Sequence, residues 1–164
     1  MAAIDLTGTW RTTAPADAVW AVIVDLTTWP LWWPAIDDVE VLAGTAVAPE
    51  AARVTFGTPV RPLRVEMAVT ATEAQRLDVV TVGGPVRGTG RLGLVDEPDL
   101  VGAGGVTGFT AVRFALRLDV RSLLFKPVER ILAGAARGSG SERLRQAGDD
   151  LARLAGGEPG HHEV

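Results

Sequence analysis

The pattern of apolar and polar positions changes period twice near the start of the chain. Residues 4–13 alternate between apolar and polar side chains, which is typical of a half-buried strand. Residues 15–26 then carry apolar side chains at helical spacing behind Pro15, so we expect a helix there. Pro30 and Pro34 interrupt the tryptophan-rich segment TTWPLWWPAIDDVEV (27–41), which predicts only one or two short helical turns.

The middle of the chain consists of short alternating runs separated by turn residues. These runs cover residues 38–43, 52–57, 63–72, 76–83, 86–95 and 106–119. Within the third run, Leu63 and Val65 share one face while Arg64 and Glu66 share the other. The pattern therefore predicts six strands that follow one another in a sheet with an apolar face and a charged face.

The last long segment has the composition of a helix, with a stripe of apolar and small residues along one side. The stripe consists of Leu132, Ala136, Gly140, Leu144, Ala147, Leu151 and Leu154. Its middle, AGAARGSGS, places small residues where a packing helix usually carries leucine, and each interior glycine costs about 0.8–1 kcal/mol of helix propensity. Either the helix is kinked or broken near Gly138–Gly140, or the short side chains leave space against the sheet; both can hold together.

Composition narrows the class of protein. A chain of 164 residues with 47 % hydrophobic residues fits one globular domain. The net charge of −4 and the dispersed basic residues argue against nucleic acid as a partner. No uncharged apolar run approaches the roughly 20 residues of a membrane span. The absence of cysteine is compatible with a reducing compartment, so we expect a cytoplasmic protein without a metal or other cofactor.

The repertoire for acid and base catalysis is small. The chain has no tyrosine, and its histidines, His161 and His162, both lie in the final segment GGEPGHHEV. Because that segment is rich in glycine and proline, we expect residues 157–164 to form a flexible tail that binds no metal. General acids and bases are then limited to carboxylates and Lys126.

Three segments carry a resemblance to a known family. They are APADAVWAVIVDLTTWPLWWPAIDDVEVL (14–42), GTGRLGL (88–94) and TAVRFALRLDV (110–120). The sequence resembles the polyketide cyclase/dehydrase and lipid-transport superfamily, the START-like (SRPBCC) group. The resemblance implies an α+β helix-grip fold in a single domain, residues 1–156, with two short helices after the first strand. A curved antiparallel seven-stranded sheet would wrap around the long C-terminal helix and enclose a cavity for an apolar ligand.

The alternation also predicts which side chains face that cavity. Gly88 and Gly90 fall in phase with Leu92 and would widen it. A one-residue slip in register would instead bring arginines inside, although all the longer strands agree on the apolar-inside register. The predicted ligand-binding residues are Trp32, Trp33, Phe56, Val65, Met67, Val69, Leu92, Phe114, Leu116, Leu132, Ala136 and Gly140.

The adjacent tryptophans need a separate interpretation. Trp32 and Trp33 cannot point the same way in regular structure, so one should face the core or cavity and the other the rim. We therefore expect the two side chains to differ clearly in burial. At least one tryptophan of the segment should serve only to hold it to the core.

Three functions remain open at this point. The first is binding or carriage of an apolar small molecule of lipid, polyketide or isoprenoid type. The second is a polyketide cyclase or dehydratase type of enzyme, for which Asp37, Asp38 and Glu40 near the tryptophan segment are the nearest proton-transfer candidates. The third is a non-catalytic interaction or regulatory module that works as a homodimer. The resemblance does not choose among them, because one fold supports many functions.

Overall fold

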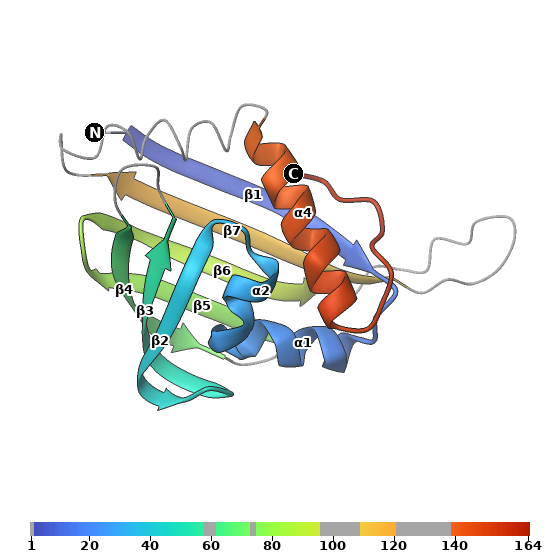
Figure 1. The fold of residues 1–164 in the computed structure, drawn as a ribbon, viewed down its shortest axis with the longest axis horizontal. Coiled ribbons are helices and arrows are strands. Elements are labelled where there is room, and N and C mark those ends of the chain that lie inside the picture. Colours follow the sequence, from blue (N-terminus) through green and yellow to red (C-terminus); the bar gives the residue numbers. More distant parts are fainter. Residues whose placement is uncertain (1, 58–61, 73–74, 96–108, 121–138) are drawn as a thin grey trace, which may run out of the picture.

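The computed structural model describes residues 2–57, 62–72, 75–95, 109–120 and 139–164. Within these ranges the chain begins with a strand, continues through three short helical segments and six more strands, and ends in a helix followed by an extended segment (Figure 1). The elements are β1 (Ala2–Thr12), α1 (Ala16–Val24), η1 (Leu26–Thr28), α2 (Trp29–Trp32), β2 (Ile36–Thr45), β3 (Ala48–Phe56), β4 (Leu63–Ala71), β5 (Arg76–Gly83), β6 (Val86–Val95), β7 (Thr110–Val120) and α4 (Ser139–Leu154).

The seven strands form one antiparallel sheet in the order β1-β7-β6-β5-β4-β3-β2. The sheet curves around α4, which crosses its concave face, while α1 and α2 lie at one end of that face (Figure 1). This arrangement is the predicted α+β helix-grip fold, and the prediction is confirmed. The first and last strands of the chain pair with each other: β1 lies beside β7 over eleven residue pairs, from Ala2 opposite Val120 to Thr12 opposite Thr110.

The connection between β1 and β2 follows the local sequence closely. Pro15 precedes the first turn of α1, where its missing N–H group is tolerated, and Pro30 lies in the first turn of α2. The Asp25 side chain accepts a hydrogen bond from the Thr27 backbone N–H and so caps η1. The indole N–H of Trp29 donates to the Ile23 carbonyl oxygen at 3.0 Å. The predicted short turns of the tryptophan segment are thus confirmed.

The sheet has the predicted apolar inner face. Val54, Val65 and Leu77 on neighbouring strands are buried, whereas Arg64 and Arg113 on the alternate positions are exposed. The slipped register, with arginines inside, does not occur on these strands. The apolar core therefore lies between the concave face of the sheet and the helices.

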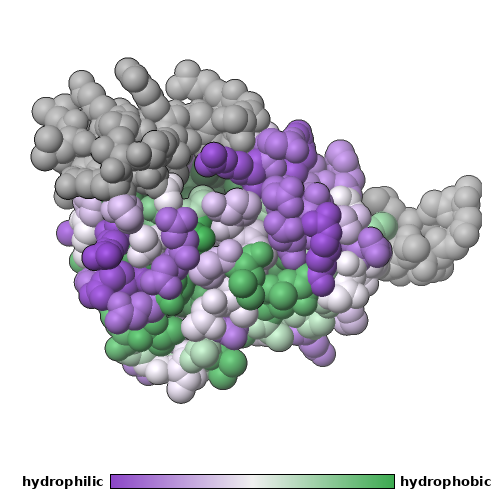
Figure 2. Space-filling view, in the orientation of Figure 1, coloured by the Kyte–Doolittle hydropathy of each residue, from purple (hydrophilic) through white to green (hydrophobic). Residues whose placement is uncertain are grey.

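The described part of the C-terminal helix packs one side against this core. Leu144, Ala147 and Leu151 of the predicted stripe are buried. Polar residues cover the outward side of α4, as Figure 2 shows. The chain before Ser139 lies outside the described residues, and with it Leu132 and Ala136. Whether the helix is kinked or broken before Ser139 therefore stays a prediction.

The sequence predicts a flexible tail over residues 157–164, and in the structure these residues have defined backbone partners. They lie along β1, where the Thr9 and Glu163 backbones exchange two hydrogen bonds of 2.7 and 2.9 Å. His162 is only 8 % exposed. Its Nδ1 accepts from the Arg11 backbone N–H at 3.1 Å, and its Nε2 lies 3.0 Å from Asp149 Oδ1. The physical reason is the open edge of β1, whose unpaired backbone groups this segment satisfies.

Candidate functional site

A cavity of about 70 Å³ lies on the concave face of the sheet, beside the first turns of α4. One water molecule needs roughly 10–15 Å³ of such space. The walls come mainly from β4, β5, β6 and β7. The lining residues are Ala35, Phe56, Gly57, Leu63, Val65, Met67, Val79, Thr81, Val86, Gly88, Thr89, Gly90, Leu116, Leu118 and Arg143. Aliphatic side chains and glycine dominate this set, so the cavity suits an apolar group.

Two glycines of β6 define the floor of the cavity. Gly88 lies opposite Leu118 of β7, and Gly90 lies opposite Leu116. A Cβ atom at Gly90 would come 2.9 Å from Val79 Cγ2 and 3.5 Å from Leu116 Cδ1, so a side chain here would occupy space between these walls. At Gly88 a Cβ atom would clash with the Arg117 carbonyl oxygen of the adjacent strand. The sequence pattern predicts that both glycines widen the pocket, and both line it.

Polar groups at the cavity are few. The Thr81 hydroxyl oxygen accepts a hydrogen bond of 2.8 Å from the Gly88 backbone N–H, which ties β5 to β6. Within the described lining, Arg143 is the one charged residue. It lies in the second turn of α4 and is exposed to solvent, so its guanidinium belongs to the mouth of the cavity rather than to its floor.

The predicted ligand-binding residues divide into three groups. Phe56, Val65, Met67 and Leu116 line the cavity. Those that belong to or pack against the core without lining the cavity are Trp32, Trp33, Val69, Leu92 and Phe114. Of the three helical residues, Gly140 falls in the first turn of α4, whereas Leu132 and Ala136 lie outside the described residues. The binding role of all twelve remains a prediction.

An aromatic cluster fills the part of the concave face next to the cavity. Trp10 stacks on Phe114 with ring centroids 4.3 Å apart and meets both Trp32 and Trp33 edge to face, at 5.8 and 5.9 Å. The Trp10 indole N–H donates to the Leu144 carbonyl oxygen of α4 at 2.8 Å. This cluster fixes α2 and α4 to the sheet, which explains why these aromatic residues are not at the cavity.

The adjacent tryptophans differ in burial as predicted. Trp32 is fully buried, whereas Trp33 is partly exposed and packs against the core from its rim. Their rings stack on each other with centroids 5.4 Å apart. The indole N–H of Trp32 has no hydrogen-bond acceptor within the part of the chain that the structure describes. The ring itself packs among Trp10, Trp29 and Trp33.

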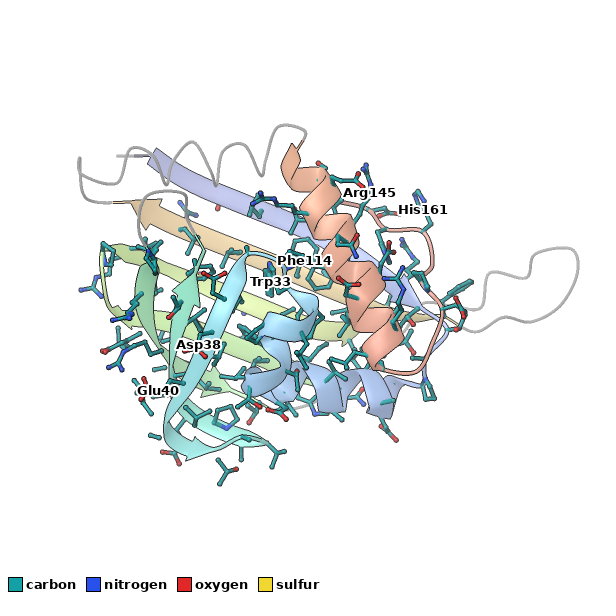
Figure 3. All side chains as sticks on the ribbon, viewed as in Figure 1. Trp33, Asp38, Glu40, Phe114, Arg145 and His161 are labelled. Atoms are coloured by element: carbon teal, nitrogen blue, oxygen red, sulfur yellow. The ribbon has the colours of Figure 1, made fainter. Side chains whose placement is uncertain are left out.

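The acidic residues near the tryptophan segment do not join the site. Asp37, Asp38 and Glu40 are exposed, and none of them lines the cavity. Figure 3 shows Asp38 and Glu40 on β2, well to the side of Trp33 and Phe114. Glu40 instead pairs with Arg53 on the outer face of the sheet at 2.6 Å. The structure therefore places Asp38 and Glu40 on the solvated side of β2, whereas the exposed Asp37 carboxylate lies beside Gly57 of the cavity lining.

The outer face of the sheet holds a second cleft of about 340 Å³, which shares Val79, Thr89, Gly90 and Leu116 with the cavity lining. At its centre Asp78 pairs with Arg91 at 2.8 Å and with Arg76 of its own strand. The hydrogen bond from Arg91 holds the pKa of Asp78 below its usual range, against the opposing effect of burial. Because these charges satisfy one another across strands, we interpret the cleft as a stabilising ion-pair network.

Sequence reasoning missed Arg143 at the cavity. It assigned the charged residues of the strands to the outer face and named Leu132, Ala136 and Gly140 as the cavity neighbours on the last helix. A signal was nevertheless available, because Arg143 follows Gly140 by three residues and precedes Ala147 by four. Residues at these spacings share one side of a helix, so Arg143 belongs beside the stripe that faces the sheet.

With this geometry in place, comparison with known proteins decides the family. The family model described as polyketide cyclase / dehydrase and lipid transport matches residues 3–156. The chain belongs to this family. A search of curated proteins finds no match. The polyketide cyclase/dehydrase and lipid-transport family is thus identified by the domain as a whole, from β1 to the end of α4.

Solved structures with this fold are similar to the chain over nearly its full length. A START superfamily protein from Mycobacterium smegmatis is 18 % identical, with 93 % of this chain and 97 % of that one covered and a TM-score of 0.68. The Zhui aromatase/cyclase from Streptomyces is 16 % identical, with 93 % and 94 % covered and a TM-score of 0.67. A Thermus thermophilus protein is 16 % identical, with 92 % and 96 % covered and a TM-score of 0.66. At identities this low, the structural similarity establishes that the fold is shared and nothing beyond it.

Two further observations concern what the described residues contain. No group of three or more histidine or acidic side chains in them is arranged to hold a metal ion. None of the helices in the described ranges is long and apolar enough to cross a membrane.

Proposed function

We propose that this protein binds or carries an apolar or amphipathic small molecule of lipid, polyketide or isoprenoid type in the cavity on the concave face. The observation that supports the proposal is an apolar hollow within a domain that is otherwise closely packed. Protein interiors normally fill such space with side chains. Here Gly90 supplies no side chain between Val79 and Leu116, although a Cβ atom would lie against both.

The energetics favour partial insertion of a ligand. Each buried methylene group contributes about 0.8 kcal/mol before the costs of association. A cavity of about 70 Å³ has room for a ring or a short run of methylene groups. A longer ligand would place its apolar end among Met67, Val79 and Leu118 and extend its other end toward the mouth at Arg143.

A matched pair of glycine substitutions tests the proposal, with 1-octanol as the probe in isothermal titration calorimetry. Gly90→Val adds a side chain on the cavity wall. Gly93→Val adds the same side chain on the same strand, where a Cβ atom has only ordinary contacts at 3.8 Å or more. If Gly90→Val removes room for two methylene groups, octanol affinity should fall about tenfold, while Gly93→Val leaves it unchanged.

Urea denaturation checks that both variants fold. Should Gly90→Val fail to fold, Gly90→Ala makes the same test with a smaller added group, one that meets Val79 and Leu116 only through their side-chain ends. Equal octanol affinity in the wild type and both variants would show that octanol binds elsewhere. No octanol binding to the wild type would count directly against the proposed function.

A further inference from the structure

Arg143 at the mouth of the cavity has no charged partner among the described residues. Arg143 projects from α4 beside walls that are apolar or glycine apart from Thr81 and Thr89. No hydrogen bond or ion pair joins it to another residue in the described ranges, although the chain is rich in arginine–carboxylate pairs. Arg145, two residues later on the same helix, pairs with Glu142 at 3.4 Å. Figure 3 places Arg145 on the side of α4 near His161.

The other described arginines without an ion pair are placed differently. Arg64 lies between Leu63 and Val65, which line the cavity, so alternation directs it to the outer face of the sheet. Arg87 lies in the same way between Val86 and Gly88 of the cavity lining, so alternation directs it to the outer face as well. Arg113 is likewise exposed, next to the buried side chains of β7. Of these unpaired guanidinium groups, Arg143 is the one that belongs to the cavity lining.

We propose that Arg143 binds the carboxylate of an amphipathic ligand whose apolar part occupies the cavity. This inference rests on the proposed function and names the class of ligand as organic acids with an aliphatic or aromatic body. A guanidinium presents parallel N–H donors that match the two oxygens of a carboxylate. The aliphatic walls offer no comparable partner for a charge, and the Thr81 hydroxyl oxygen already accepts from Gly88.

The position of Arg143 at a wet mouth sets the size of the effect. A fully buried arginine would have to lose its hydration, which offsets much of the attraction to an anion. An exposed arginine keeps its water until the ligand arrives, so the gain from one ion pair is modest, about fivefold in affinity. The apolar walls supply the remaining affinity for acid and alcohol alike, which makes the ratio between the two ligands the informative quantity.

The test compares octanoate with 1-octanol in calorimetric titrations of the wild type and three variants. Arg143→Gln should lower octanoate affinity about fivefold and leave octanol affinity unchanged. Arg143→Lys keeps the charge and should restore part of the preference for octanoate. Arg145→Gln removes a neighbouring charge outside the cavity lining and should change neither ligand. Raising the ionic strength should weaken octanoate binding to the wild type and not to Arg143→Gln.

Each contrary result has a distinct meaning. If Arg143→Gln weakens both ligands equally, the residue supports the shape of the cavity and the inference is wrong. Unchanged octanoate affinity in Arg143→Gln, or an equal loss in Arg145→Gln, would also overturn it. In each of these cases the proposed function still holds if the wild type binds octanol and Gly90→Val weakens that binding. If the wild type binds neither ligand, the proposed function fails and the inference fails with it.

Discussion

Along β6 and β7 the concave face of the sheet changes within a few residues from packed to hollow. In the packed half, Leu92 lies opposite Phe114, and both are buried under the Trp10 cluster. In the open half, Gly88 and Gly90 lie opposite Leu118 and Leu116, and all four line the cavity. Both halves share one sheet, one helix and one alternation of side chains. The difference shows that cavity position depends on where aromatic rings are inserted.

Glycine admits different neighbours in the two halves. In the packed half, a Cβ atom at Gly8 would lie 2.6 Å from Phe114 Cζ, and one at Gly148 would lie 2.5 Å from Trp10 Cδ1. These glycines let aromatic rings approach the backbone closely. In the open half, Gly90 faces only the ends of aliphatic side chains. In both halves the missing Cβ atom allows close approach, by aromatic rings in the packed half and by aliphatic side chains and the β7 backbone in the open half.

The largest expected effect comes from removing the centre of the packed half. Trp10→Ala deletes a ring that is 1 % exposed, together with its hydrogen bond to the Leu144 carbonyl oxygen. The free energy of unfolding should fall by about 3–5 kcal/mol, as measured by urea denaturation. Trp20→Ala is the control, since Trp20 is only partly buried and should cost less. Similar losses in the two variants would contradict a packed half organised around Trp10.

A leucine in each half permits a matched comparison of intermediate size. Leu92→Ala creates a new void among close neighbours, whereas Leu118→Ala enlarges a space that already exists. A side chain beside a void has fewer contacts to lose. We expect losses of about 4 kcal/mol for Leu92→Ala and about 2–3 kcal/mol for Leu118→Ala in urea denaturation. Equal losses, or the reverse order, would mean that the open half is packed as well as the other.

The sequence predicts the fold more fully than the site. The predicted runs 76–83 and 86–95 coincide with β5 and β6, because strict alternation records which face of a strand is buried. Alternation does not show whether an inward-facing residue lies in the packed or the open half of the concave face. Met67 and Phe114 therefore read alike in sequence, although one lines the cavity and the other stacks on Trp10. Only the long-range contacts among tryptophans separate the two halves.

The ends of the domain show a second limit of sequence reasoning. A glycine- and proline-rich terminus is usually frayed, and nothing local in GGEPGHHEV indicates that it follows β1. Its partner is a strand edge more than 140 residues earlier, as in the hydrogen bond between Arg11 and His162. Arg143 was missed for a related reason, because a charged residue on a helix is normally solvated, and the cavity beside it forms only when distant strands come together.

The smallest predicted effect is the pH dependence of the free energy of unfolding that His162 of the terminal segment causes. Burial lowers the pKa of His162, against the opposing effect of Asp149, so the folded protein favours the neutral ring. Nearby Arg11 and His161 lower the pKa further. Since Nδ1 accepts from the Arg11 backbone N–H, the proton of the neutral ring lies on Nε2, toward Asp149.

Protonation would place a second donor opposite the Arg11 N–H group and oppose the packing of the terminal segment. The unfolded chain, with a histidine pKa of about 6.5, binds protons before the folded one does. The free energy of unfolding should therefore be highest above about pH 6.5 and decrease as the pH falls toward the lower pKa of the folded state. His162→Gln should flatten this step in urea denaturation, whereas His161→Gln, on an exposed side chain, should retain it. If the decrease with falling pH persists in His162→Gln, another titrating group causes it. His162 would then not link the terminal segment to the stability of the packed half.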